Sequence, residues 1–190
     1  MVAAEERLAA KIGADILEQG GNAVDAAVAV GFALAVTYPA AGNLGGGGFM
    51  LLRTAQGETA AIDYRETAPA AATRNMYVGA DGKVDLKKIY FSHAASGVPG
   101  SVAGLLLAQE KYGRLSRRKV MAPAIRLAEK GYPIHYFNAS AIEQSRTMLM
   151  RNAAAKREFE ATGFGWIVST LMEQDCRLND LPALIEAVAV

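Results

Sequence analysis

The run Ala26–Val36 holds eleven consecutive apolar residues and most constrains the fold. It is too short to span a bilayer, so the sequence predicts a buried helix and no membrane span. Asn22 and Asp25 form a variant of the capping box at its start, and Tyr38-Pro39 ends it. A helix that is apolar on nearly every face must be covered on all sides by other elements.

The remaining patterns predict the order α-α-β-β-α-α-α-α with one β-hairpin. Two strands alone are marginal in water, so we expect the sheet to be incomplete. Pro123 lies inside one helical pattern and is expected to move its regular start towards Ala122. The stretch Gly79–Lys88 is polar, and Asp81-Gly82 within it predicts a turn. The other expected helices and strands are Glu5–Glu18, Phe49–Thr54, Thr59–Tyr64, Ser101–Tyr112, a helix capped by Ser116, Asn138–Arg157 and Leu178–Val190.

Composition narrows the function classes. The chain has 190 residues, is 52% hydrophobic and has a net charge of +1, so no basic field favours nucleic acid. The 37 alanines and 19 glycines supply little bulk, so a core requires close packing or surfaces outside this chain. Cys176 is alone and cannot form an internal disulfide. No signal peptide opens the chain, so as given it is expected to be unexported.

A search for catalytic and metal-binding patterns yields little. There is no G-x-S-x-G elbow, and His93 and His135 lack metal-ligand spacing, so we expect no metal and no cofactor. Both histidines are interpreted as loop or surface residues, and Cys176 as an apolar filler. The glycine run Gly45–Gly48 follows a helix and opens a strand, the reverse of a phosphate loop. We expect a tight backbone crossing there.

The segment Asp63–Pro69 holds the strongest candidate for ligand binding. Arg65 lies at the end of a predicted strand, where its guanidinium could hold a carboxylate with two parallel hydrogen bonds. An ordinary ion pair with Glu66 or Asp63 explains the same residues equally well.

Five blocks in order resemble the γ-glutamyltranspeptidase (glutathione hydrolase) family. The resemblance is strong over residues 1–135 and weak over residues 136–190. The blocks are Gly20–Ala27, Gly42–Met50, Asp63–Pro69, Gly97–Gly104 and Pro123–Glu129.

The resemblance implies an α+β fold, an incomplete αββα four-layer sandwich of the N-terminal nucleophile hydrolase type. It also implies a precursor that cuts itself into two subunits, and a small-subunit N-terminal threonine that attacks γ-glutamyl amides such as glutathione. Arg65 would hold the substrate α-carboxylate. The complete protein would be periplasmic or extracellular.

The threonines of this chain depart from that pattern. None of the eight stands in a Thr-Thr-His/Gln setting: Thr147 follows an arginine inside a predicted helix, and Thr170 lies in an apolar run. We therefore expect a piece of the large subunit that carries no catalytic residue, lacks its small-subunit partner and is inactive alone. The alternatives are a degenerate remnant or partner-binding fragment, and a related acylase acting on another amide.

Overall fold

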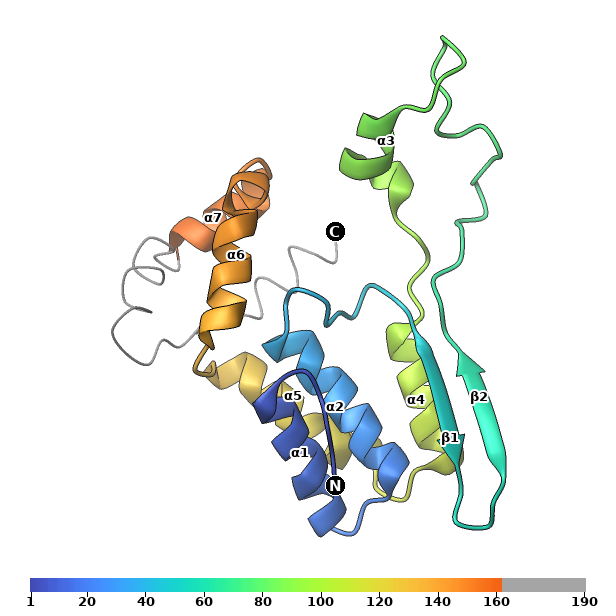
Figure 1. Ribbon diagram of the computed structural model, residues 1–190, viewed down its shortest axis with the longest axis vertical. Helices are drawn as coiled ribbons and strands as arrows, with labels where there is room; N and C mark the ends of the chain where they lie inside the picture. Colours follow the sequence, from blue (N-terminus) through green and yellow to red (C-terminus); the bar gives the residue numbers. More distant parts are fainter. Residues whose placement is uncertain (162–190) are drawn as a thin grey trace. The chain divides into compact units, whose positions relative to one another are not determined.

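The computed structural model describes residues 1–161 (Figure 1). The predicted helix over Leu178–Val190 and the lone Cys176 lie outside these residues. The elements in chain order are α1 (Arg7–Glu18), α2 (Ala23–Thr37), β1 (Phe49–Arg53), β2 (Thr59–Asp63), α3 (Leu86–Phe91), the 3-10 helix η1 (His93–Ala95), α4 (Ser101–Tyr112), α5 (Arg117–Lys130), α6 (Tyr136–Leu149) and α7 (Ala153–Ala161).

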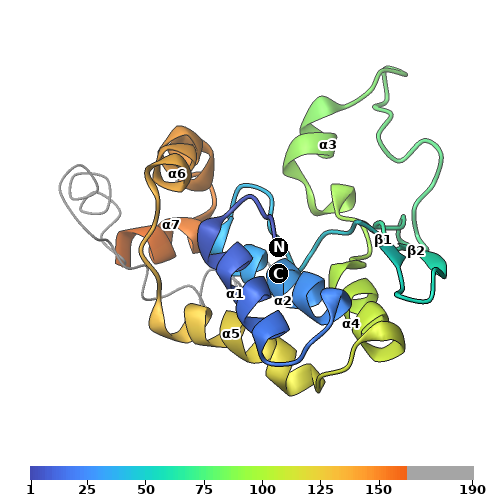
Figure 2. The same ribbon diagram turned by 60° about the horizontal axis from the view of Figure 1, so that its bottom comes forward.

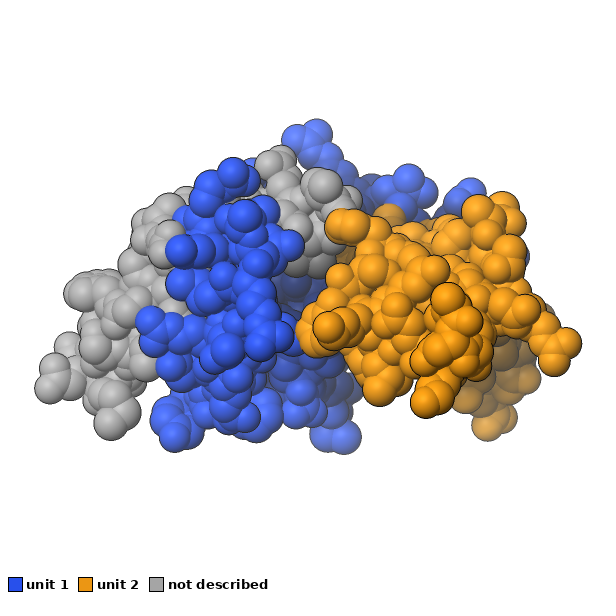
Figure 3. Space-filling model, turned by 90° about the horizontal axis from the view of Figure 1, so that it is seen from above, with its two compact units in different colours: residues 1–43, 105–190 blue, residues 44–104 orange. Residues whose placement is uncertain are grey.

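The chain divides into two compact units, coloured separately in Figure 3. Unit 1 comprises Met1–Asn43 and Leu105–Val190, and unit 2 comprises Leu44–Gly104. The boundary falls inside α4, so the first turn of this helix belongs to unit 2 and its remainder to unit 1.

Helix α2 forms the centre of unit 1. It packs against α1 on one side and α5 on another, and the three helices lie side by side in both ribbon views (Figures 1 and 2). Ten of its fifteen residues are buried, as the apolar run predicts. Ala9 of α1 meets Val30 and Ala33 of α2 in the middle of this core. The small side chains let the helix backbones approach closely.

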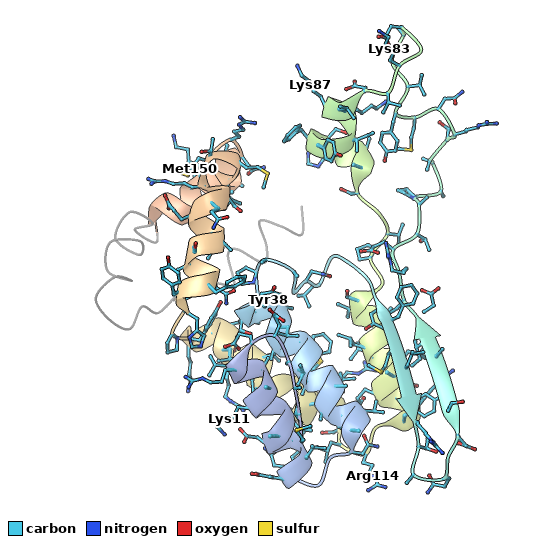
Figure 4. All side chains as sticks on the ribbon, viewed as in Figure 1. Lys11, Tyr38, Lys83, Lys87, Arg114 and Met150 are labelled. Carbon is cyan, nitrogen blue, oxygen red and sulfur yellow. The ribbon has the colours of Figure 1, made fainter. Side chains whose placement is uncertain are left out.

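The N-terminal end of α2 is fixed by a buried carboxylate. Asn22 and Asp25 form the predicted capping box, in which Asp25 Oδ2 accepts from the Asn22 backbone N–H at 3.0 Å. Asp25 is completely buried and also accepts from the backbone N–H of Arg114 at 2.9 Å and of Leu115 at 3.3 Å. One carboxylate therefore joins the start of α2 to the α4–α5 loop, where Figure 4 labels Arg114.

The C-terminal end of α2 is held by two side chains from the segment after α5. The Tyr132 hydroxyl donates to the Val36 carbonyl at 2.9 Å, and Asn138 Nδ2 donates to the Thr37 carbonyl at 2.7 Å. These are carbonyls of the last helical turn, which have no partner within the helix. Burial, with a smaller contribution from the negative charge of Glu6, raises the pKa of Tyr132, so its hydroxyl remains a donor.

Unit 2 is built on the predicted hairpin. Strands β1 and β2 pair antiparallel, from Phe49 opposite Asp63 to Arg53 opposite Thr59. The described residues form this single two-stranded sheet, so the chain is helix-rich with little β-structure. Leu51 of β1 is 83% exposed.

A long excursion follows the hairpin. The residues between the isolated bridge partners Thr67 and Val98 carry α3 and η1 (Figure 1). Lys83 and Lys87, labelled in Figure 4, lie on it.

Two sequence predictions about helices were wrong in detail. The polar stretch Gly79–Lys88 contains the predicted turn at Asp81-Gly82, where the Gly82 N–H donates to the Gly79 carbonyl at 3.0 Å, but it also contains the start of α3, which the sequence pattern did not predict. Asp85 accepts from the Lys88 backbone N–H at 3.1 Å and caps this helix. Helix α5 begins at Arg117 rather than near Ala122. The cap at Ser116 and the burial of Val120 and Ala124 offset the one backbone hydrogen bond that Pro123 removes.

The helix expected over Asn138–Arg157 is two helices, α6 and α7. Asn152 separates them, since its Oδ1 accepts from the backbone N–H of Ala154 at 2.9 Å and of Ala155 at 3.0 Å. Helical propensity alone did not reveal this internal cap, because asparagine is tolerated within helices as well as before them.

We predict that Asp25→Ala lowers the free energy of unfolding by about 3 kcal/mol, because it removes a fully buried carboxylate that accepts hydrogen bonds from partly buried N–H groups of two segments. The control is Asp15→Ala, which removes an exposed pair with Lys11 and should cost less than about 1 kcal/mol. Urea unfolding followed by circular dichroism measures both. Equal losses for the two variants would contradict the proposed role of Asp25.

Candidate functional site

Arg65 lies where the sequence predicted it, immediately beyond the hairpin. Tyr64 extends the ladder by one pair: its N–H donates to the Gly48 carbonyl at 3.0 Å, and the Gly48 N–H donates back at 3.3 Å. The Arg65 N–H then donates to Asp63 Oδ1 at 3.0 Å, which turns the chain away from the sheet. Regular strand pairing and a side-chain turn together fix the point at which Arg65 leaves the strand.

The guanidinium of Arg65 is largely accessible. Its Nε donates to Glu66 Oε2 at 3.0 Å, and its side chain is 62% exposed. The guanidinium carbon lies 6.0 Å from the centre of the Phe49 ring, within the range of a cation–π contact. Within residues 1–161 the guanidinium hydrogen-bonds and ion-pairs through Nε alone. The two terminal nitrogens therefore remain for a ligand.

Glu66 is held in its charged form. Its own backbone N–H is the main cause that lowers the pKa of this carboxyl, followed by the Arg65 side chain and by the backbone N–H of Gly47, while desolvation opposes them. The ion pair that the sequence offered as the ordinary explanation of Arg65 thus exists. It occupies one edge of the guanidinium and leaves the other unoccupied in the described part of unit 2.

The glycine run makes the backbone crossing that the sequence predicted. The Gly46 carbonyl accepts from the N–H groups of Gly100 at 2.8 Å and Ser101 at 2.9 Å, at the start of α4. A Cβ on Gly47 would lie 2.5 Å from the Tyr64 carbonyl oxygen. None of the glycines in Gly45–Gly48 has a positive φ, so close approach is the property that this run uses.

The other sequence candidates do not belong to the segment that carries Arg65. His93 lies in η1 of unit 2, whereas His135 belongs to unit 1, where its Nε2 is 3.5 Å from Glu6 Oε1. Thr147 lies within α6, and Thr170 and Cys176 are outside the described residues. Over residues 1–161 no group of His, Cys, Asp or Glu side chains is arranged to hold a metal ion.

Sequence reasoning overlooked Tyr64. This residue lies against the glycines of two separate blocks, Gly42–Met50 and Gly97–Gly104. Glycines on both sides of the Arg65 block were visible in the sequence, but their common neighbour was not.

No helix among the described residues has the length and apolarity needed to cross a bilayer.

The γ-glutamyltranspeptidase family model matches residues 9–177. The chain belongs to this family. It is 58% identical over 135 residues to the glutathione hydrolase proenzyme of Escherichia coli K12, which covers 71% of this chain and 23% of that protein. It is 46% identical over 156 residues to the glutathione hydrolase proenzyme of Bacillus subtilis 168, covering 81% of this chain and 27% of that protein. The resemblance found in the five blocks is confirmed.

Solved structures agree with this membership. The γ-glutamyltranspeptidase of Helicobacter pylori superposes with a TM-score of 0.81 at 45% identity, covering 84% of this chain and 46% of that chain. The enzyme from Pseudomonas nitroreducens complexed with L-DON gives a TM-score of 0.82 at 37% identity, covering 98% and 52%. The chain spans about a quarter of the length of the curated relatives that it matches.

We predict that Arg65→Gln raises the Glu66 pKa but leaves it below its ordinary value, because the main cause of the depression is the backbone N–H of Glu66 itself. A depressed carboxyl pKa stabilises the folded state above the unfolded-state pKa, and this contribution is lost as the pH falls through the folded-state pKa. A ¹³C NMR titration of the glutamate carboxyls measures the shift.

The control for this titration is Arg53→Gln, which removes another exposed arginine of the same hairpin. It should leave the Glu66 titration unchanged. A Glu66 pKa in Arg65→Gln that equals the original value would refute the coupling of these two side chains.

Proposed function

We propose that this chain forms the N-terminal part of the large subunit of a γ-glutamyltransferase, a glutathione hydrolase that cleaves γ-glutamyl amides such as glutathione. The observation that carries the proposal is the position of Arg65, directed off the end of the hairpin with its terminal nitrogens unoccupied by the described residues. Membership of the family supports the proposed reaction, and the chemistry of the guanidinium supports the proposed role of Arg65 in binding the substrate.

Arg65 binds the α-carboxylate of the γ-glutamyl donor in this proposal. A guanidinium presents paired N–H groups in a plane, which match the two oxygens of a carboxylate. Glu66 accepts from Nε and thereby limits the rotation of the planar group. The donor then uses the opposite edge, so the Arg65–Glu66 ion pair and ligand binding are compatible.

The reacting atoms come from outside this chain. We propose that the hydroxyl of the N-terminal threonine of a small subunit attacks the γ-glutamyl carbonyl while its own α-amine takes the hydroxyl proton. The amide C–N bond then breaks, the released amine receives that proton, and the γ-glutamyl group stays on the threonine as an ester. The acyl-enzyme passes its γ-glutamyl group to water or to an amino acid. The complete αββα sandwich would require further strands beside β1 and β2. We place the complete protein in the periplasm or outside the cell.

A related acylase is the second candidate. Its support is the likeness to the cephalosporin acylase of Bacillus halodurans, with a TM-score of 0.67 at 27% identity. The γ-glutamyltranspeptidase from Helicobacter pylori is more similar on both measures, at 0.81 and 45%. We therefore favour a γ-glutamyl donor, whose α-carboxylate gives Arg65 a function.

A chimaeric proenzyme tests the proposal. In it, the 135 residues of this chain that align with the Escherichia coli relative replace their counterpart in that protein. We predict that Arg65→Lys raises the KM for γ-glutamyl-p-nitroanilide about tenfold or more, because lysine cannot make the bidentate contact. Steady-state kinetics measure the change.

Arg53→Lys is the control, because it makes the same exchange at an exposed arginine of β1. Its KM should remain that of the parent chimaera. Equal KM values for Arg65→Lys and the parent would refute the carboxylate role. A parent chimaera without turnover, while the Escherichia coli protein is active, would favour the degenerate remnant.

We also predict that the 190-residue chain alone does not hydrolyse γ-glutamyl-p-nitroanilide, because the nucleophile belongs to the small subunit. The Escherichia coli relative serves as the positive control. Turnover that co-purifies with the chain and decreases in Arg65→Lys would overturn this expectation.

A further inference from the structure

We propose that Tyr64, enclosed by glycines of the α2–β1 connection and of the segment that begins α4, is the positioning residue that sets where Arg65 presents its guanidinium. The inference rests on the proposed role of Arg65. It concerns unit 2 alone, since the glycines involved all lie within Leu44–Gly104. It is based on four glycines that lie so close to Tyr64 and Arg65 that a Cβ atom would not fit at these positions.

The backbone of Tyr64 and Arg65 is enclosed by two glycines. A Cβ on Gly47 would lie 2.5 Å from the Tyr64 carbonyl oxygen and 2.8 Å from Arg65 Cα. A Cβ on Gly100 would overlap the same carbonyl oxygen and lie 3.2 Å from the Arg65 carbonyl oxygen. Backbone atoms cannot yield to such contacts, so any larger residue would displace the chain at Arg65.

The Tyr64 side chain is enclosed by two further glycines. A Cβ on Gly48 would lie 2.9 Å from Tyr64 Cε2, and a Cβ on Gly104 would lie 2.5 Å from Cδ1 and overlap Cβ and Cγ. The ring is half-buried, and this burial raises the pKa of the Tyr64 hydroxyl. The ring therefore occupies a slot that exists only because these positions lack side chains.

The slot bears directly on Arg65, because adjacent Cα atoms are held at a fixed separation by the trans peptide. Arg65 has few other anchors: within the described residues its side chain is largely exposed, pairs with Glu66 and lies over the Phe49 ring. A displaced Tyr64 would thus move the guanidinium relative to the donor. Misplacement by about 1 Å can cost roughly 100-fold in a positioned reaction.

The test uses the chimaeric proenzyme and two donors, γ-glutamyl-p-nitroanilide with a free α-carboxylate and its α-methyl ester. The measured quantity is the ratio of kcat/KM for the two donors, which reports carboxylate recognition. We expect Gly104→Ala to lower this ratio roughly tenfold, through the KM of the free acid with little change in kcat. Alanine favours helix over glycine, so weakened α4 propensity cannot explain a loss.

Gly45→Ala is the matched control, because a Cβ there meets nothing within 4 Å and its φ is not positive. It should retain the ratio of the parent chimaera. A general disturbance of the glycine run would instead lower kcat/KM for both donors in Gly45→Ala and Gly104→Ala alike, and that result would overturn the inference.

If the Gly104→Ala chimaera is not cleaved into two subunits, a double-mutant cycle between Gly48 and Tyr64 tests the positioning role of Tyr64 instead. A Cβ at Gly48 would meet the far end of the Tyr64 ring, which leucine lacks. We expect Gly48→Ala to lower the ratio in the Tyr64 background and to have little further effect in the Tyr64→Leu background. Additive effects would overturn the inference.

The two proposals fail differently. A ratio that falls in Arg65→Lys but remains unchanged in Gly104→Ala and Gly48→Ala would overturn the positioning role of Tyr64 and leave the carboxylate role of Arg65 intact. A ratio unchanged in Arg65→Lys would overturn both.

Discussion

The burial of α2 on nearly all sides is the constraint on which unit 1 depends. An all-apolar helix gains from burial, but the polar groups at its two ends must then find partners inside the protein. Asp25 satisfies N–H groups at the first end, and Tyr132 and Asn138 satisfy carbonyls at the second. Tyr132 and Asn138 come from about 100 residues further along the chain, and Asp25, itself a residue of α2, also accepts from the Arg114 N–H 89 residues away, so these bonds join α2 to the α4–α5 loop and to the segment after α5.

Unit 2 depends on the close approach of backbone segments, as unit 1 depends on the burial of α2. The hairpin itself is small and buries little, with Ile62 its one buried apolar side chain among the described residues. The hydrogen bonds from Gly100 and Ser101 to the Gly46 carbonyl hold two distant glycine blocks together beside the end of β2. The backbone around Arg65 is therefore packed by close glycine contacts and backbone hydrogen bonds rather than by an apolar core.

This arrangement is compatible with a chain that represents part of a family fold. The matched stretch makes up about a quarter of the curated relatives, and apolar side chains such as Phe49 and Leu51 are exposed on the sheet. The proposed site would also be shared: this chain would bind the substrate, whereas the nucleophile would come from another segment. If Arg65 binds the donor as proposed, the bond from its Nε to Glu66 would orient the guanidinium beforehand and so lower the entropic cost of binding.

The sequence by itself determined the local structure wherever chemistry and neighbours in sequence suffice. The capping box at Asn22, the apolar helix, the hairpin and the placement of Arg65 after a strand were all predictable, because caps, periodicity and turn residues act over a few positions. At α5 the predicted cap at Ser116 is confirmed, and only the expected shift of the helix start towards Ala122 was wrong, because Pro123 is accommodated inside the helix. The sequence did not reveal the short helix α3, which Asp85 caps, or the break between α6 and α7, where Asn152 caps α7. Aspartate and asparagine also occur in turns and within helices, so their presence alone does not predict a cap.

Only the tertiary structure decided what distant blocks do together. That Asp25 serves a second segment besides its own helix, and that Gly48 and Gly104 enclose one tyrosine ring, depends on contacts between residues far apart in the chain. A glycine run shows from the sequence that side chains are absent, but only the structure shows which atoms fill the space where those side chains would be. The physical reason is that capping and periodicity are local, whereas excluded volume and long-range hydrogen bonds exist only once the chain has folded.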